Sequence, residues 1–395
     1  MRFIFDRCRL IQLLLPCGDG SLQTYSISRA SPYPQVCPGP FPRTVYAAAH
    51  IVANPQNPDP WGRPLVDWDK TLAFRHHLWG LNFKIAEAMD TSQRGMGFDW
   101  WNAQELISRV LADARTVKGA DLASGAGTDH LEIGDARTLD DIVRAYEMQA
   151  EFIESRGGRI ILMASRALAA LARTPDDYFK VYDRVLSGCR NKVILHWLGD
   201  MFDPALKGYW GSTDINAAMD CCLAVINAHA DKVDGIKISL LEARYEIEMR
   251  RRLPPGVAMY TGDDFNYSEL IAGDQSGYSH GLLGIFDAIA PAAAAALKSL
   301  GQGDRATYDA ILAPTIPLSR KIFEAPTQYY KAGIVFLAWL NGFQAHFAMV
   351  GGMQSARGIL HYADIFRLAD QAGLIINPDM AGTRMKNLCQ INGIA

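Results

Sequence analysis

Short apolar runs alternate with helical patterns along most of this chain, and this rhythm restricts the fold more than any other feature. Strands that alternate with helices form parallel sheets, and no glycine fingerprint of an open nucleotide-binding sheet follows the first run. Eight runs have the length and residue types of buried strands, at 44–52, 83–89, 120–126, 159–165, 192–198, 233–239, 257–262 and 275–280. The sequence therefore predicts an α/β protein built on a closed (β/α)8 TIM barrel.

Two further segments flank the barrel pattern. Residues 11–27, "IQLLLPCGDGSLQTYSI", alternate around Gly-Asp-Gly and predict a β-hairpin. From about 288 to 373 the patterns are helical throughout. We therefore expect an N-terminal extension with a hairpin over 1–42, the barrel over 43–300, and a C-terminal helical bundle and tail over 301–395.

Composition excludes several classes of partner. The formal net charge of −3 and the lack of any Lys/Arg run argue against nucleic acid or an anionic membrane surface. The longest apolar run, 332–352, contains Asn, Gln and His and predicts a buried helix, not a membrane span. Seven cysteines without C-x-x-C spacing indicate neither a disulfide framework nor a zinc knuckle, and the N-terminus lacks a signal cleavage site, so we expect a cytoplasmic protein.

Catalytic residues of a TIM barrel lie where its strands end and in the loops that follow. That rule selects candidates without reference to their chemistry, and four of the nine histidines are among them. The candidates are His50, Glu87, Asp90, Thr91, Ser92, Thr128, Asp129, His130, Ser165, Arg166, His196, Lys237, Asp263, Asp264 and His280.

Lys237 is the most unusual of these residues because it lies within an apolar run, "VDGIKISLL". Side chains alternate along a strand, so Ile236 and Ile238 face the helices while Lys237 faces the barrel interior, where Gly235 and Ser239 leave it room. Burial lowers the pKa of a lysine and frees its amine for attack on a carbonyl. The alternative is a lysine at a strand edge that extends to water or forms a structural ion pair.

His196 has the same inward parity in the preceding strand, "VILHW". A histidine beside an imine-forming lysine can move the protons that the reaction requires, and it ordinarily titrates near neutrality. A hydrogen-bonded core histidine is the alternative interpretation.

The order of the motifs resembles the dihydrodipicolinate synthase and N-acetylneuraminate lyase family of Schiff-base barrels. In that family a lysine on strand six forms an imine with pyruvate or a related 2-keto acid, and "VDGIKIS" places Lys237 at that position. The family's G-T-T-G-E, which binds the keto-acid carboxylate, corresponds to "DTSQR", with Thr91 and Ser92 at the hydroxyl positions and Asp90 for the first glycine. "SGAGTD" with Thr128, "TGDD" with Asp263, and the turn after His280 follow in the family's order.

The chain also departs from this family at strands four and five. The family's strand-five tyrosine, a proton relay, is replaced by His196, and "ASRAL" replaces T-P-Y-Y at strand four. Arg166 in this segment would clamp a carboxylate or phosphate, or pair with an acid on the rim. Tyr209 and Trp210 lie in a long loop after strand five and are candidates for a lid.

The resemblance implies a class I lyase or aldolase without a cofactor, in which Lys237 and His196 are catalytic. Its substrate would be a small 2-keto acid or keto-sugar acid bound by Asp90, Thr91, Ser92, Thr128, Arg166, Asp263 and His280, and the enzyme would be a homo-oligomeric dimer or tetramer. A second hypothesis is a metal-dependent sugar isomerase or epimerase with ligands such as His50, Glu87 and His130. A third is a barrel that binds a sugar acid without catalysis.

Overall fold

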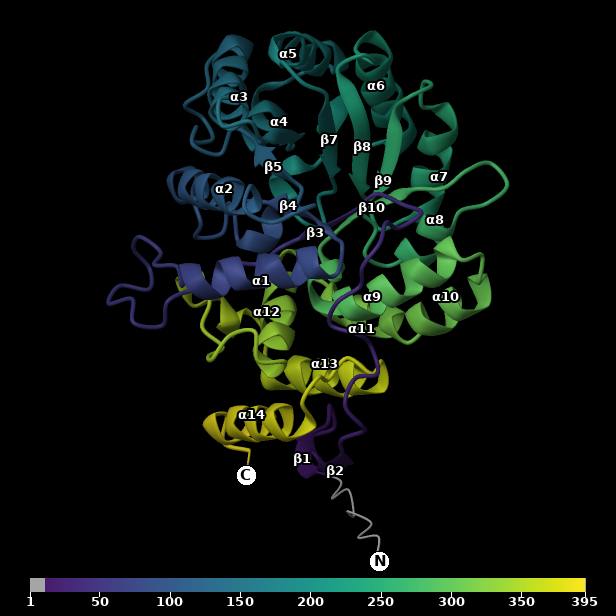
Figure 1. The fold of residues 1–395 in the computed structure, drawn as a ribbon. Coiled ribbons are helices and arrows are strands. Elements are labelled where there is room, and N and C mark those ends of the chain that lie inside the picture. The colour runs from purple at the N-terminus through teal and green to yellow at the C-terminus, as the bar shows by residue number, and fades with distance from the viewer. Residues whose placement is uncertain (1–10, 395) are drawn as a thin grey trace, which may run out of the picture.

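The computed structural model describes residues 11–394, and a closed barrel of eight parallel strands lies at its centre (Figure 1). Each strand pairs with the strands before and after it in the sequence, and β10 closes on β3. The predicted (β/α)8 barrel is therefore confirmed. Its strands are β3 (Val45–Ala48), β4 (Lys84–Glu87), β5 (Leu122–Ala126), β6 (Arg159–Leu162), β7 (Val193–Leu198), β8 (Val233–Ser239), β9 (Ala258–Thr261) and β10 (His280–Leu283).

Helices connect these strands and cover the outside of the barrel. Several begin at a cap that the sequence specifies: Thr138 and Asp141 form a capping box on α3, and Thr174 does so with Asp177 on α5. The connecting helices are α1 (Trp68–Gly80), α2 (Trp100–Ala114), α3 (Leu139–Glu154), α4 (Arg166–Leu171), α5 (Pro175–Gly188), α6 (Ile215–Ala228), α7 (Ala243–Arg252), α8 (Tyr267–Ala272) and α9 (Ile285–Gly301).

The eighth strand lies later in the chain than the sequence pattern predicts. Residues 274–277 form a turn, in which Asp274 N–H donates to Gly277 O, Gly273 and Gly277 both adopt positive φ, and only His280 of the predicted run lies in the strand. A turn of this kind needs glycine at such positions. The strand itself is "HGLL", so the prediction of a strand over 275–280 is wrong.

The last helices form a layer on one side of the barrel, and the N-terminal hairpin packs against them (Figure 1). The hairpin pairs β1 (Gln12–Pro16) with β2 (Leu22–Ser26) in antiparallel register, as expected. Tyr25 Oη donates to Asp370 Oδ2 at 2.7 Å and ties it to the helices. These helices are α10 (Arg305–Leu312), α11 (Thr315–Ile322), α12 (Tyr330–Leu340), α13 (Ile359–Gln371) and α14 (Pro378–Ile391).

Two side-chain layers separate the barrel interior from its outer face. The cluster inside the barrel includes Tyr46, Ile194 and Tyr260. Leu195 and Trp197 lie on the same strand as Ile194, β7, but pack outward in the larger core between the barrel and its helices. All residues of α12 are buried, so the prediction of a buried helix over 332–352 is confirmed as far as Leu340, where the helix ends and turns follow. None of the helices in the described part of the chain is long and apolar enough to cross a membrane, and the cysteines within 11–394 form no disulfide. The N-terminal segment through Leu10, where a signal would begin and Cys8 lies, is outside the described residues.

Candidate active site

Lys237 lies inside the barrel near the carboxyl end of β8, at the wall of a small cavity. The cavity measures about 10 Å³, enough for a single water molecule. Lys237 is 7% exposed, and within residues 11–394 its ammonium makes no hydrogen bond or ion pair. The other residues that line the cavity are Ala48, Met89, Asp90, Thr91, Leu198, Phe202, Ser239, Asp264, Gly284 and Tyr330.

The room for Lys237 comes mainly from a glycine on the neighbouring strand. A Cβ on Gly262 would lie 2.7 Å from Lys237 Cε, and 2.6 Å from the carbonyl oxygen of Ile238. Gly235 serves another purpose, because a Cβ there would lie 2.6 Å from the ring of Tyr260. The expectation that Gly235 makes space for the lysine is therefore wrong; it makes space for an aromatic ring lower in the barrel.

Two carboxyl groups share the cavity with Lys237. Burial lowers the pKa of Lys237, and the negative charges of Asp90 and Asp264 partly oppose this effect. Burial also raises the pKa of Asp264 to about 7, although its Oδ1 accepts a hydrogen bond from Ile285 N at 2.9 Å. The site thus contains an amine and a carboxyl group that both change charge closer to neutrality than free side chains do.

His196 is the direct neighbour of Lys237 across the β7–β8 ladder. Its Nε2 lies 3.3 Å from Ser239 Oγ, and its buried Nδ1 has no partner among the described residues. Burial, followed by the charge of Lys237, holds the pKa of His196 well below its ordinary value. The expectation that this histidine titrates near neutrality is therefore wrong, because its ring is neutral there.

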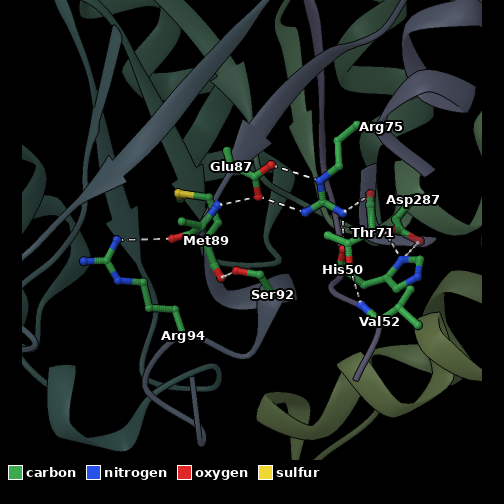
Figure 2. Close-up of polar contacts among 10 residues, drawn as sticks. His50, Val52, Thr71, Arg75, Glu87, Met89, Ser92, Arg94 and Asp287 are labelled. Carbon is green, nitrogen blue, oxygen red and sulfur yellow. Dashed lines mark hydrogen bonds and ion pairs between the residues drawn. The ribbon is translucent and has the colours of Figure 1, made fainter. Parts of the chain in front are cut away.

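Thr91 and Ser92 differ in what their hydroxyls contact. Thr91 lines the lysine cavity, and its Oγ1 lies 2.7 Å from Tyr330 Oη. Ser92 Oγ instead donates to the carbonyl oxygen of Met89 at 2.7 Å and stabilises the turn Asp90–Ser92 (Figure 2). The structure thus brings Thr91, but not the hydroxyl of Ser92, to the lysine.

A wider cleft of about 340 Å³ adjoins the lysine cavity, and Asp90 and Leu198 line both. Thr128, Arg166 and His196 also line the cleft. Thr128 Oγ1 lies 2.6 Å from Ser165 Oγ, the cap of α4. Substrate atoms beyond the carbonyl would have room in this cleft.

Both arginines of the cleft are held in ion pairs. Arg166 pairs with Asp203, so it has the acid partner that the sequence left as one of two alternatives. Arg94 Nη2 lies 2.7 Å from Asp129 Oδ1, and its guanidinium also donates to the carbonyl oxygens of Ala88 and Gly125. Arg94 therefore joins the turn after β4 to the loop after β5 and shapes the wall of the cleft.

Two predicted substrate-binding residues lie away from the lysine cavity. Asp263 Oδ1 accepts from the backbone N–H groups of Phe265 and Asn266, so its carboxylate closes the loop and its neighbour Asp264 faces the lysine instead. His280 is the first residue of β10 and therefore lies at the amino end of the barrel, opposite the site. Its Nδ1 accepts from Thr44 N at 3.0 Å.

The proposed lid residues are core residues. Tyr209 and Trp210 are 3% and 0% exposed. Tyr209 Oη accepts from Ser165 N at 3.0 Å, and the ring of Trp210 packs against Tyr182 of α5 with centroids 4.6 Å apart. The idea of a lid formed by these two residues is therefore wrong, and Phe202 from the same loop lines the lysine cavity instead.

The alternative metal ligands are each bound to a different partner. Glu87 forms a fully buried two-point ion pair with Arg75, and His50 Nδ1 lies 2.8 Å from Asp287 Oδ2 (Figure 2). His130 Nδ1 lies 2.8 Å from the side-chain amide of Gln149. Within residues 11–394 no three His, Cys, Asp or Glu side chains are placed to hold a metal ion.

Sequence reasoning missed one residue of the lysine cavity that carries chemistry. Tyr330 begins α12, almost a hundred residues after Lys237, and its sequence context is a helical apolar run. Nothing in that run marks its hydroxyl as functional, because Tyr330 is simply the second residue of "YYKAGIVFLAWL".

Comparisons with known proteins are consistent with this architecture. A family model described as a protein of unknown function (DUF993) matches residues 13–394. No curated protein is significantly similar.

Solved structures that are similar include three proteins described as dihydrodipicolinate synthases or members of that family. YagE, a prophage protein of E. coli K12 solved in complex with pyruvate, is 11% identical, with a TM-score of 0.62 over 89% of this chain and 99% of that one. The enzymes of Bacteroides thetaiotaomicron and Oceanobacillus iheyensis are 12% and 13% identical, with TM-scores of 0.62 and 0.58. They cover 82% and 77% of this chain, and 99% and 88% of their own. At these identities the likeness is one of fold.

Proposed function

This chain belongs to the family described as proteins of unknown function (DUF993), and we propose that it is a class I lyase of the aldolase type. In this proposal Lys237 forms a Schiff base with a 2-keto acid or keto-sugar acid. The observation that carries the proposal is a buried amine with no hydrogen-bond or ion-pair partner among residues 11–394, at the carboxyl end of a TIM-barrel strand and in a cavity that adjoins a larger cleft.

The first step is attack of the neutral amine on the substrate carbonyl. The C–N bond forms as the carbonyl π bond breaks, and one proton moves from the positively charged nitrogen to the negatively charged oxygen to give a neutral carbinolamine. A second proton on that oxygen allows it to leave as water, which produces a protonated imine. The imine draws electrons from the adjacent carbon, so a C–C or C–H bond there can break and leave an enamine.

The cavity and the cleft provide the remaining functions. The hydroxyl of Thr91 is the donor for the substrate group beside the carbonyl. His196 lines the cleft and its Nε2 lies 3.3 Å from Ser239 Oγ, which lines the lysine cavity, so this pair can exchange protons between the cleft and the cavity. The distal part of the substrate lies in the cleft beside Arg166 and Thr128. This chemistry uses the lysine itself and requires no cofactor.

Borohydride trapping tests the proposal directly. The protein is incubated with pyruvate and a panel of other 2-keto acids, reduced, and examined by intact mass and peptide mapping. We expect a mass increase of one reduced keto acid at Lys237, which is lost in Lys237→Ala. No adduct with any keto acid in the panel would refute the proposal.

Lys331 provides a matched control because it is the other buried lysine of this region. It is 4% exposed, burial lowers its pKa to about 8, and it lines neither the cavity nor the cleft. The variant Lys331→Met should keep the adduct. An adduct that moves to Lys331, or one that Lys331→Met abolishes, would contradict the assignment to Lys237.

A further inference from the structure

The lysine cavity contains a single phenol, and it comes from the C-terminal helices and not from the barrel. Tyr330 is the first residue of α12, is 4% exposed, and lines the cavity together with Lys237. Its hydroxyl lies 2.7 Å from Thr91 Oγ1. An aromatic hydroxyl thus reaches the imine site from outside the sheet.

The position of this ring is closely fixed. Tyr330 stacks on Phe323 with ring centroids 4.4 Å apart and planes 14° from parallel, and the edge of Phe202 packs at 6.0 Å. Gly284 is what lets the ring approach β10, because a Cβ there would lie 3.1 Å from Tyr330 Cε2 and 3.5 Å from Thr91 Oγ1. A ring held in this way needs no reorganisation when a substrate arrives.

His196 occupies a different place relative to the amine. It lines the cleft but not the lysine cavity, and Ser239 lies between its Nε2 and that cavity. Its ring also stays neutral because burial and the charge of Lys237 lower its pKa. It is therefore less suited to give a proton to an oxygen that forms inside the cavity.

We propose that Tyr330 is a catalytic residue of the imine chemistry, and that its hydroxyl, held by Thr91, carries protons between the lysine nitrogen and the substrate oxygen. This inference rests on the proposed function. When the amine adds to the carbonyl, the phenol O–H gives its proton to the new alkoxide, and the phenolate takes one from the positively charged nitrogen. The phenol is restored and one proton has moved from nitrogen to oxygen.

The electrostatics of the cavity suit this role. Burial, and next the negative charge of Asp90, raise the pKa of Tyr330 well above its ordinary value. The phenol therefore holds its proton until an alkoxide forms, and a phenolate is short-lived beside a cationic nitrogen. Thr91 can donate to the phenolate for that time, since either hydroxyl of the pair can be the donor.

The test compares Tyr330→Phe with Tyr267→Phe. Tyr267 is an equally buried tyrosine whose Oη lies 2.6 Å from Thr315 Oγ1, but it lies outside the cavity. Two rates are measured with pyruvate: the approach to the trapped adduct, and the exchange of the methyl protons for deuterium in D2O by NMR. General acid–base groups contribute about 100- to 10,000-fold, so we expect losses in this range for Tyr330→Phe and less than threefold for Tyr267→Phe.

Four outcomes separate the two proposals. If the wild-type protein traps pyruvate and Tyr330→Phe does so at the wild-type rate, the role of Tyr330 is refuted while the imine stands. If the wild type shows neither adduct nor exchange with any keto acid, the proposed function fails and this role with it. If both tyrosine variants lose rate and melting temperature equally, Tyr330 has a structural role only. If Tyr330→Phe forms the adduct slowly but reaches the wild-type yield at long times, its role in proton transfer is supported.

Discussion

Replacement of Gly262 by Ala tests how closely the site confines Lys237. The added Cβ would lie 2.7 Å from Lys237 Cε, whereas carbon atoms pack at about 3.5–4.0 Å. The added Cβ would also clash with Ser239 Oγ and lie 2.6 Å from the backbone oxygen of Ile238. Because the backbone oxygen leaves the Cβ little room, the side chains of Ser239 and Lys237 must both move, the lysine by roughly 1 Å. Misplacement of a reacting group by about 1 Å costs on the order of 100-fold in rate.

The rate of adduct formation with pyruvate is the assay for this variant, with stability measured in urea. We expect Gly262→Ala to slow trapping on the order of 100-fold and to cost about 1–3 kcal/mol of unfolding free energy, as overpacked cores do. Gly188→Ala is the control, because Gly188 ends α5 and its Cβ would meet nothing within 4 Å. A wild-type trapping rate in Gly262→Ala would show that the lysine position does not depend on this glycine.

Three more predictions concern charge. Asp90 lines the lysine cavity where the resemblance places a carboxylate-binding turn, so Asp90→Asn should tighten pyruvate binding in calorimetry by about tenfold, the effect of ~1.4 kcal/mol of relieved repulsion; unchanged or weaker binding would count against this reading. Because burial lowers the pKa of Lys237, the rate of adduct trapping should rise with pH and level off below pH 10.5. Burial raises the pKa of Asp264 to about 7, so the curve of trapping rate against pH should also bend near pH 7, and this bend should vanish in Asp264→Asn. Glu87→Gln leaves the fully buried Arg75 without its counter-charge, and should lower the unfolding free energy by about 3–5 kcal/mol in urea; a loss under about 1 kcal/mol would contradict it.

The barrel itself was predictable because its evidence is local and repeated. Each strand is a short apolar run, and each helix has its own period and often its own cap, as at Thr138. The eighth strand was misplaced because the local evidence there is weak. The run "QSGYSH" is no more apolar than a turn, and the positive φ of Gly273 and Gly277, which marks the turn, cannot be read from periodicity. The inward direction of Lys237 followed from strand parity, which needs only the strand to be identified.

The second layer of contacts could not be read in this way. Parity states that Gly235 and Lys237 share a face, but the pitch of the barrel decides which neighbour fills each gap, and Tyr260 fills the one at Gly235. A loop residue such as Tyr209 has no parity at all, and its burial against α5 depends on the path of the whole loop. Glu87 is a similar case. In the sequence it is a candidate metal ligand, but in the fold its carboxylate forms a buried ion pair with Arg75, a partner that periodicity does not reveal.

Tyr330 illustrates the limit most clearly, because its importance arises from packing between two parts of the chain. In the sequence it begins an apolar helix, and nothing local distinguishes its hydroxyl from that of Tyr329. Only when α12 packs against α9, with the Tyr330 ring beside Gly284, does that hydroxyl meet Thr91 in the turn after β4. The strand-five histidine, His196, is buried and lines the cleft, whereas the phenol of Tyr330 lines the lysine cavity itself. The C-terminal helices are therefore part of the proposed site.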